Sequence, residues 1–102
     1  MIALSDKTFN KYLDDDMPLF VMFHAAFSGP CVLAAPEFQK AANRAGNRIR
    51  FATFDLDGNT DTPERFNIRG IPEFILFIDG EPTNPTVGAL TCEQLLVVIN
   101  HE

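Results

Sequence analysis

The sequence has few cysteines and few basic residues, and it lacks any long apolar run. Its two cysteines, Cys31 and Cys92, are far apart, so they do not resemble the paired framework of small disulfide-rich domains. The eight lysines and arginines are scattered along a chain whose net charge is −6. Phosphate binding needs clustered basic side chains, which argues against a nucleic-acid ligand. No apolar stretch approaches the ~20 residues that cross a bilayer, so we expect no membrane span.

The N-terminus also lacks the basic segment and apolar core that are typical of a secretory signal. Together with the cysteine usage, this predicts a reducing, cytoplasmic setting. A chain of 102 residues is expected to form a single domain over residues 1–102, and we expect a monomer. Hydrophobic residues make up 46% of the chain and include ten phenylalanines, which is enough for a packed interior.

An apolar run over residues 19–24 predicts the central strand of a sheet. The run follows Pro18 and does not alternate with polar residues, which fits a strand covered by helices on both faces. Further strands are predicted over residues 1–4, 49–56, 73–78 and 81–87, with Arg50 pointing outward. Asp79-Gly80 favours a tight hairpin, and the last strand contains Pro82 and Pro85, so that strand is predicted at the sheet edge.

Helical spacing and capping residues predict the remaining elements. The expected helices run from Ser5 or Asp6 to Leu13, from Cys31 to about Ala45 with Gly46 as the stop, from Thr60 or Asp61 for a short stretch, and onward from Thr91. Pro36 should kink the second helix, and His101 should complement the C-terminus of the last one. The predicted order is β-α-β-α-β-α-β-β-α, an α/β domain with a parallel first part and a terminal antiparallel hairpin.

Acidic residues gather after the third predicted strand, from Asp55 to Asp61. This spacing hints at a calcium loop, but the glycine at position 58 is misplaced for an EF-hand, and acidic turns are common. We therefore expect neither a metal site nor a cofactor.

The stretch Phe27-Ser28-Gly29-Pro30-Cys31 joins the central strand to the longest helix. Gly29 and Pro30 favour a tight turn, and proline suits the first turn of a helix because its missing N–H would be unpaired there. The free N–H groups of such a helix start point toward position 28. A thiol at that position would be an activated nucleophile, but the chain carries the hydroxyl of Ser28.

Three segments in the same order resemble the thioredoxin family. They are residues 21–31 together with Ala35-Pro36, residues 66–72 (Phe-Asn-Ile-Arg-Gly-Ile-Pro), and Asp79-Gly80 followed by residues 87–90 (Val-Gly-Ala-Leu). The resemblance covers essentially the whole chain. It implies a thioredoxin fold, with a central mixed sheet flanked by helices on both faces, and the activity of a thiol-disulfide oxidoreductase.

The resemblance also implies roles for particular residues. Cys31 matches the second, resolving cysteine, and Ser28 stands where the attacking cysteine would be. Pro72 matches the proline that the family holds in cis, so that Ile71 would offer its backbone N–H and C=O groups to an extended substrate segment. Gly88 would line the same groove. Phe27, Gly29 and Pro30 complete the implied substrate-binding surface.

The sequence departs from the family pattern around this turn. Met22 replaces a buried aspartate, Thr53 replaces its lysine partner, and His24 and Phe27 replace tryptophans. Serine cannot form a disulfide, so we expect the chain to be inactive in dithiol exchange.

Cys31 remains as a single thiol, and a monothiol reaction is conceivable. A helix N-terminus and His24 would favour its thiolate form, whereas burial would oppose it, and we expect an inert or slowly reactive thiol. His24 is expected to line the groove rather than act as a base. Ser28 has no His/Asp partners for hydrolysis, and helix capping would explain it.

The origin of Ser28 leaves two interpretations open. Serine could be an engineered replacement in an active protein-disulfide reductase whose motif is Cys-Gly-Pro-Cys, in which case a thioredoxin reductase would be a partner. Alternatively the chain could be a naturally divergent, redox-independent binding module. In that case the groove of Phe27, Ile71, Pro72 and Gly88 would dock an extended segment of a partner protein.

Overall fold

The computed structural model describes residues 1–100, apart from the side chain of Asn84, so the prediction for His101 lies outside the described residues. The strands form one sheet in the order β1-β3-β2-β4-β5. Their bounds are β1 (Ile2–Leu4), β2 (Leu19–His24), β3 (Arg50–Asp55), β4 (Glu73–Ile78) and β5 (Glu81–Val87). Strands β1, β2 and β3 are parallel, whereas β4 and β5 are antiparallel to their neighbours. The predicted α/β topology, with β5 at the edge, is confirmed.

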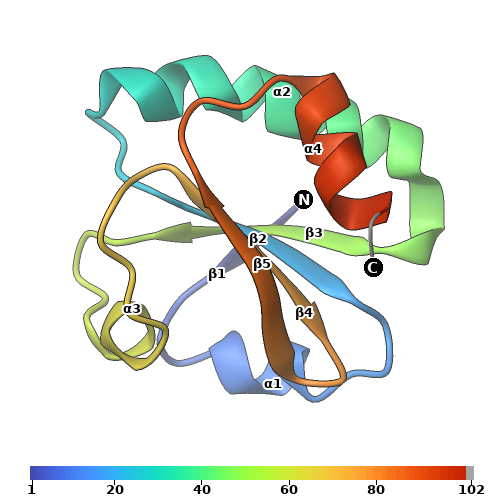
Figure 1. Cartoon of the computed structure of the whole chain (residues 1–102). Helices are drawn as coiled ribbons and strands as arrows, with labels where there is room; N and C mark the ends of the chain where they lie inside the picture. The colour runs from blue at the N-terminus through green and yellow to red at the C-terminus, as the bar shows by residue number, and fades with distance from the viewer. Residues whose placement is uncertain (101–102) are drawn as a thin grey trace.

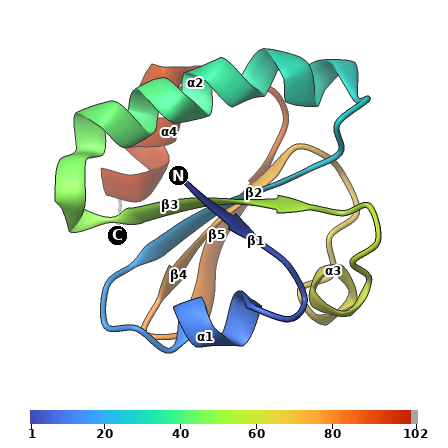
Figure 2. The ribbon, with the colours of Figure 1, turned by 180° about the vertical axis from the view of Figure 1, so that it is seen from behind.

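Helices cover both faces of this sheet (Figures 1 and 2). Their bounds are α1 (Phe9–Leu13), α2 (Gly29–Ala45), α3 (Asp61–Arg65) and α4 (Cys92–Asn100), and a short 3-10 turn follows α2 at Gly46–Arg48. Helices α2 and α4 lie on one face, and α1 and α3 lie on the other. Each face therefore has its own apolar core, one built around Phe20, Phe38 and Phe74 and the other around Phe9 and Phe54.

Helix α2 carries the central turn because its sequence favours both of its ends. Ser28 is extended at the N-cap position, with φ −84° and ψ 123°, and Pro30 lies in the first turn. Gly46 ends the helix with φ +70°, a conformation that glycine adopts at little cost. The Ser28 hydroxyl makes no capping hydrogen bond, so the expected capping role is wrong even though the position is right.

The start of α1 differs from the prediction because Asp6 serves another helix. Helix α1 begins only at Phe9, after a turn. The Asp6 carboxylate instead accepts the N–H groups of Asp61 at 3.0 Å and Thr62 at 2.8 Å, at the start of α3. A carboxylate is favoured there by the unpaired N–H groups of the first helical turn. Asp6 thus ties α3 to the segment after β1.

Arg50 does not point outward into solvent as predicted. Its Nη2 donates to the Met17 carbonyl oxygen at 2.8 Å, and only 14% of its side chain is exposed. The loop before β2 therefore covers it. None of the helices described within residues 1–100 is both long and apolar enough to cross a membrane.

Candidate functional site

Three loops meet at one end of the sheet: residues 25–28 after β2, residues 66–72 before β4, and residues 88–91 after β5 (Figures 1 and 2). The strand register brings them together. Phe23 of β2 is paired with Glu73 of β4, and Glu73 is paired with Val87 of β5. The turn at residues 27–31, the Ile71-Pro72 segment and the Gly88 segment therefore lie together at this end of the sheet.

Direct contacts connect the loop before β4 to the loop after β5. The Gly88 N–H donates to the Pro72 carbonyl oxygen at 2.9 Å. A Cβ atom on Gly70 would lie 2.8 Å from Cγ1 of Val87, so a side chain at position 70 would require the Val87 side chain or one of the two segments to shift. The Ile71-Pro72 peptide bond is cis. Pro72 is buried and Ile71 is half-buried.

The loop after β2 presents its side chains differently. The Phe27 side chain is fully exposed and Gly29 and Pro30 are exposed, whereas Ser28 is half-buried. The Ser28 N–H donates to the Ala25 carbonyl oxygen at 3.2 Å, and its carbonyl oxygen accepts the Val32 N–H at 3.0 Å. These bonds hold a compact turn that leads directly into α2, with an unsupported aromatic ring at its outside.

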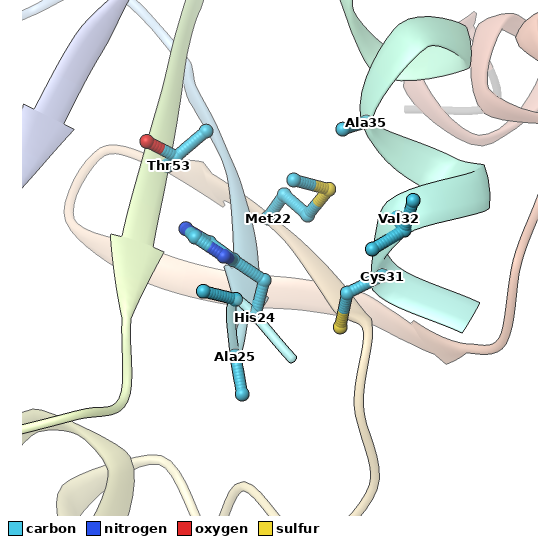
Figure 3. A pocket seen from close by; sticks show the side chains of 8 residues that line it. Met22, His24, Ala25, Cys31, Val32, Ala35 and Thr53 are labelled. Carbon is cyan, nitrogen blue, oxygen red and sulfur yellow. The ribbon is translucent and has the colours of Figure 1, made fainter. Parts of the chain in front are cut away.

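Cys31 is buried in the first turn of α2, where only 4% of it is exposed. Both cysteines are free thiols. Cys31 borders a hollow of about 370 Å³ between α2 and the face of the sheet. As Figure 3 shows, Met22, His24 and Thr53 line it from β2 and β3, opposite Cys31, Val32 and Ala35 on α2. Ala25 and Ala26 complete the lining.

The chemistry of this hollow follows from the residues of its lining. None of them is acidic, and Met22 adds a thioether to the same lining as the thiol of Cys31. The imidazole of half-buried His24 is the only other titratable group in the lining. His24 therefore lines the space beside the Ser28 turn, close to where the sequence analysis expected it. No carboxylate of the lining could accept a proton from Cys31.

The two cysteines should differ in reactivity because Cys31 borders a hollow, whereas Cys92 is almost fully buried. We expect methyl methanethiosulfonate, a very small reagent, to modify Cys31 of the native chain at least about ten times faster than Cys92. Cys92 is 1% exposed and lies at the start of α4, where local opening would be needed. Mass spectrometry after timed quenching measures both rates, with Cys31→Ala as the control that isolates Cys92. Faster labelling of Cys92 would contradict the role of the hollow.

A second hollow, of about 440 Å³, lies beside the same turn. It is lined by Ala25, Ala26, Phe27, Ser28, Asp55, Leu56 and Asp57. Sequence reasoning did not identify it. The only signal for it in the sequence is the acidic segment directly after the third strand, which by itself is also typical of an ordinary acidic turn. Because β2 and β3 are parallel, with His24 paired to Asp55, the segments that follow them emerge side by side.

Glu73 is a buried acid at this end of the sheet that sequence reasoning also did not single out. It is 6% exposed and directly follows Pro72. Burial raises the pKa of its carboxyl group above the ordinary value of 4.5, although the backbone N–H groups of Arg69 and Gly70 oppose the shift. The carboxyl group therefore interacts with the backbone of the loop that carries Ile71.

Glu73 should make the stability of the fold depend on pH. Because its pKa is raised in the folded state, its contribution is fully present below about pH 4.5 and is lost as the pH rises through the folded-state pKa. The free energy of unfolding of the native chain, relative to that of Glu73→Gln, should therefore fall as the pH rises from about 4 to about 8. Urea unfolding at each pH measures this difference. A difference that stays constant or rises would contradict the shift.

Comparisons with known proteins agree with this architecture. The family model described as Thioredoxin matches residues 1–101. A thioredoxin of Acidithiobacillus ferridurans is 35% identical over 103 residues, covering 100% of this chain and 95% of that protein. A thioredoxin of Alicyclobacillus acidocaldarius is 34% identical, covering 92% and 90%, and one of Pseudomonas aeruginosa is 32% identical, covering 98% and 94%. The chain therefore belongs to the thioredoxin family of thiol-disulfide oxidoreductases.

Proposed function

We propose that this chain is a redox-independent member of its family that binds an extended segment of a partner protein at the Phe27 end of the sheet. Dithiol exchange needs two neighbouring thiols, one to attack a disulfide and one to release the mixed disulfide that results. Ser28 and Cys31 provide one hydroxyl and one thiol. Cys92 is buried at the start of α4 and does not replace the missing thiol.

The observation that carries the proposal is the gathering of exposed apolar side chains around this turn. Among the described residues, the large hydrophobic side chains that are more than half exposed are Met1, Phe27, Val32, Leu33, Val87 and Val97. Phe27, Val32 and Leu33 belong to the turn and the start of α2. Val87 is the last residue of β5 and lies at the same end of the sheet. Exposed apolar side chains that gather at one end of a domain are typical of a protein-binding site.

The backbone next to this surface suits an extended segment. Within the described residues, the N–H and C=O groups of Ile71 make no backbone hydrogen bond to the rest of the chain. Its loop is held by the bond from Gly88 to Pro72 and by the packing of Gly70 against Val87. A partner segment could therefore form β-type main-chain bonds with a loop that is already ordered.

The test is a selection of nine-residue peptides displayed on phage against the native chain. We expect binders whose affinity falls at least about tenfold in Phe27→Ser, as for an aromatic hot spot. Val97→Ser is the matched control because it removes an exposed apolar side chain from α4 instead. A selection without binders, or binders that ignore Phe27, would overturn the proposal.

One feature favours a second function, that of a protein-disulfide reductase whose first cysteine has been replaced by serine. The Gly29-Pro30 turn still brings Ser28 and Cys31 to the start of α2, as an exchanging cysteine pair would require. In that case the protein with cysteine at position 28 would reduce protein disulfides, and thioredoxin reductase would be its partner. Restoring a cysteine at position 28 tests whether the scaffold still supports disulfide reduction, and a variant that stays inactive would exclude this second function.

A further inference from the structure

The hollow beside Ser28 combines an apolar wall with two carboxylates. Ala25, Ala26, Phe27 and Leu56 supply the apolar lining, and Asp55 and Asp57 supply the acidic part of a space of about 440 Å³. It lies beyond the carboxyl ends of β2 and β3, which is where α/β sheets commonly bind ligands. Phe27 borders this hollow and also belongs to the exposed apolar surface described above.

We propose that this hollow receives the side chain of a lysine or arginine from the docked partner segment. The inference rests on the proposed function, and it adds the chemical class of the partner. The aliphatic part of a basic side chain would pack on Leu56 and the alanines, while its charged end would reach the carboxylates of Asp55 and Asp57. The Phe27 ring could add a cation–π contact.

The charges around the hollow select this occupant. Neither Asp55 nor Asp57 forms an ion pair within residues 1–100. The acidic residues that do form ion pairs there are Asp15, Glu37 and Glu93. Asp55 Oδ1 accepts the Asp57 N–H at 2.9 Å, which orders the two residues relative to each other. The chain also carries a net charge of −6, so an acidic partner would be repelled.

Other occupants fit the lining less well. An uncharged apolar side chain would contact the alanines and Leu56, but it would leave two carboxylates partly desolvated without a partner. A metal ion would need further ligands, and no group of three or more His, Cys, Asp or Glu side chains within residues 1–100 is arranged to hold one. A basic side chain satisfies both parts of the hollow.

The peptide selection tests this inference with two matched changes. Selected peptides should be enriched in lysine or arginine, and in the tightest of them we replace the basic residue by norleucine, which keeps the aliphatic stem. With the native chain, this replacement should weaken binding about three- to tenfold at low salt, and less at high salt. With Asp55→Asn/Asp57→Asn it should have little effect, so that the double-mutant cycle gives a clear coupling.

Asp14→Asn/Asp16→Asn is the matched control, because it changes the net charge by the same amount at the opposite end of the sheet, before β2, and neither residue forms an ion pair among the described residues. It should leave the norleucine effect unchanged. Binders without basic residues, or a coupling equally reduced in the control, would overturn this inference and leave the proposed docking intact. A selection that yields no binder would overturn both.

Discussion

Replacing Ser28 by cysteine is expected to give this chain a catalytic disulfide-reduction activity, which we propose that the unsubstituted chain lacks. With dithiothreitol as the electron source and insulin as the substrate, the rate should rise at least about a hundredfold above that of the unsubstituted chain. The new thiol would stand at the N-terminus of α2, where unpaired N–H groups favour its thiolate. It would attack a substrate disulfide, and the Cys31 thiol would then displace the reduced substrate and close a disulfide with the new cysteine, which dithiothreitol reduces.

The surroundings of Cys31 limit the rate that this variant can reach. Cys31 must lose its proton to act as the displacing thiolate, and the hollow beside it contains Met22 instead of a carboxylate. Ser28→Cys/Met22→Asp should therefore be faster than Ser28→Cys alone, provided that the aspartate can accept this proton.

Two controls make the result specific. Ser28→Ala should match the unsubstituted chain, and Ser28→Cys/Cys31→Ser should stop at a mixed disulfide that mass spectrometry detects. Repeated turnover by the unsubstituted chain would contradict the proposed redox-independent function. If Ser28→Cys stays inactive while peptides still bind, the interpretation as a disulfide reductase with one replaced cysteine is wrong.

The sheet could be predicted closely from the sequence because its strands are marked by strong local signals. The apolar run of β2 and the prolines of β5 are properties of single segments, and the predicted bounds of β4 and β5 match the structure. The start of α4 is also a local signal. Thr91 Oγ1 accepts the Gln94 N–H at 3.2 Å, while Gln94 Oε1 accepts the Thr91 N–H, which is a capping box.

Contacts between distant segments could not be predicted in the same way. Asp6 caps α3 across 55 positions of the chain, and the Glu37 carboxylate accepts the Cys92 N–H at the start of α4. The sequence does not show whether an acidic residue caps the helix that follows it or a helix far along the chain. The capping assigned to Asp6 and the outward direction assigned to Arg50 failed for this reason.

The site was predictable as a set of backbone positions, whereas its hollows were not. The family resemblance implies that the turn at Ser28, the Ile71-Pro72 segment and Gly88 share one groove, and the strand register brings these segments to the same end of the sheet. The free space beside Cys31 and Phe27 depends on how completely neighbouring side chains fill the volume. Packing of this kind is a property of the folded chain, and no residue pattern reports it.

Truncating Phe20 should cause a larger loss of stability than any of the other substitutions. Phe20 is 0% exposed, and its ring lies 5.6 Å from that of Phe38, 5.4 Å from that of Phe51 and 6.0 Å from that of Phe74, measured between ring centroids. Phe20→Ala would leave a cavity between β2 and α2 that these rings cannot close. The expected loss is about 3–5 kcal/mol of unfolding free energy, a large share of the about 5–15 kcal/mol that holds an ordinary domain folded.

Phe27→Ala is the matched control for this experiment because it deletes the same atoms from a fully exposed ring. Its unfolding free energy should stay within about 0.5 kcal/mol of the native value, since no buried surface is lost. Urea unfolding followed by far-UV circular dichroism measures both variants. If Phe20→Ala does not fold, Phe20→Leu keeps most of the apolar volume and should still lose more than Phe27→Ala. Equally small losses would mean that the aromatic cluster under α2 does not stabilise the fold. Equally large losses would mean that the exposed Phe27 ring is held by contacts outside its own turn.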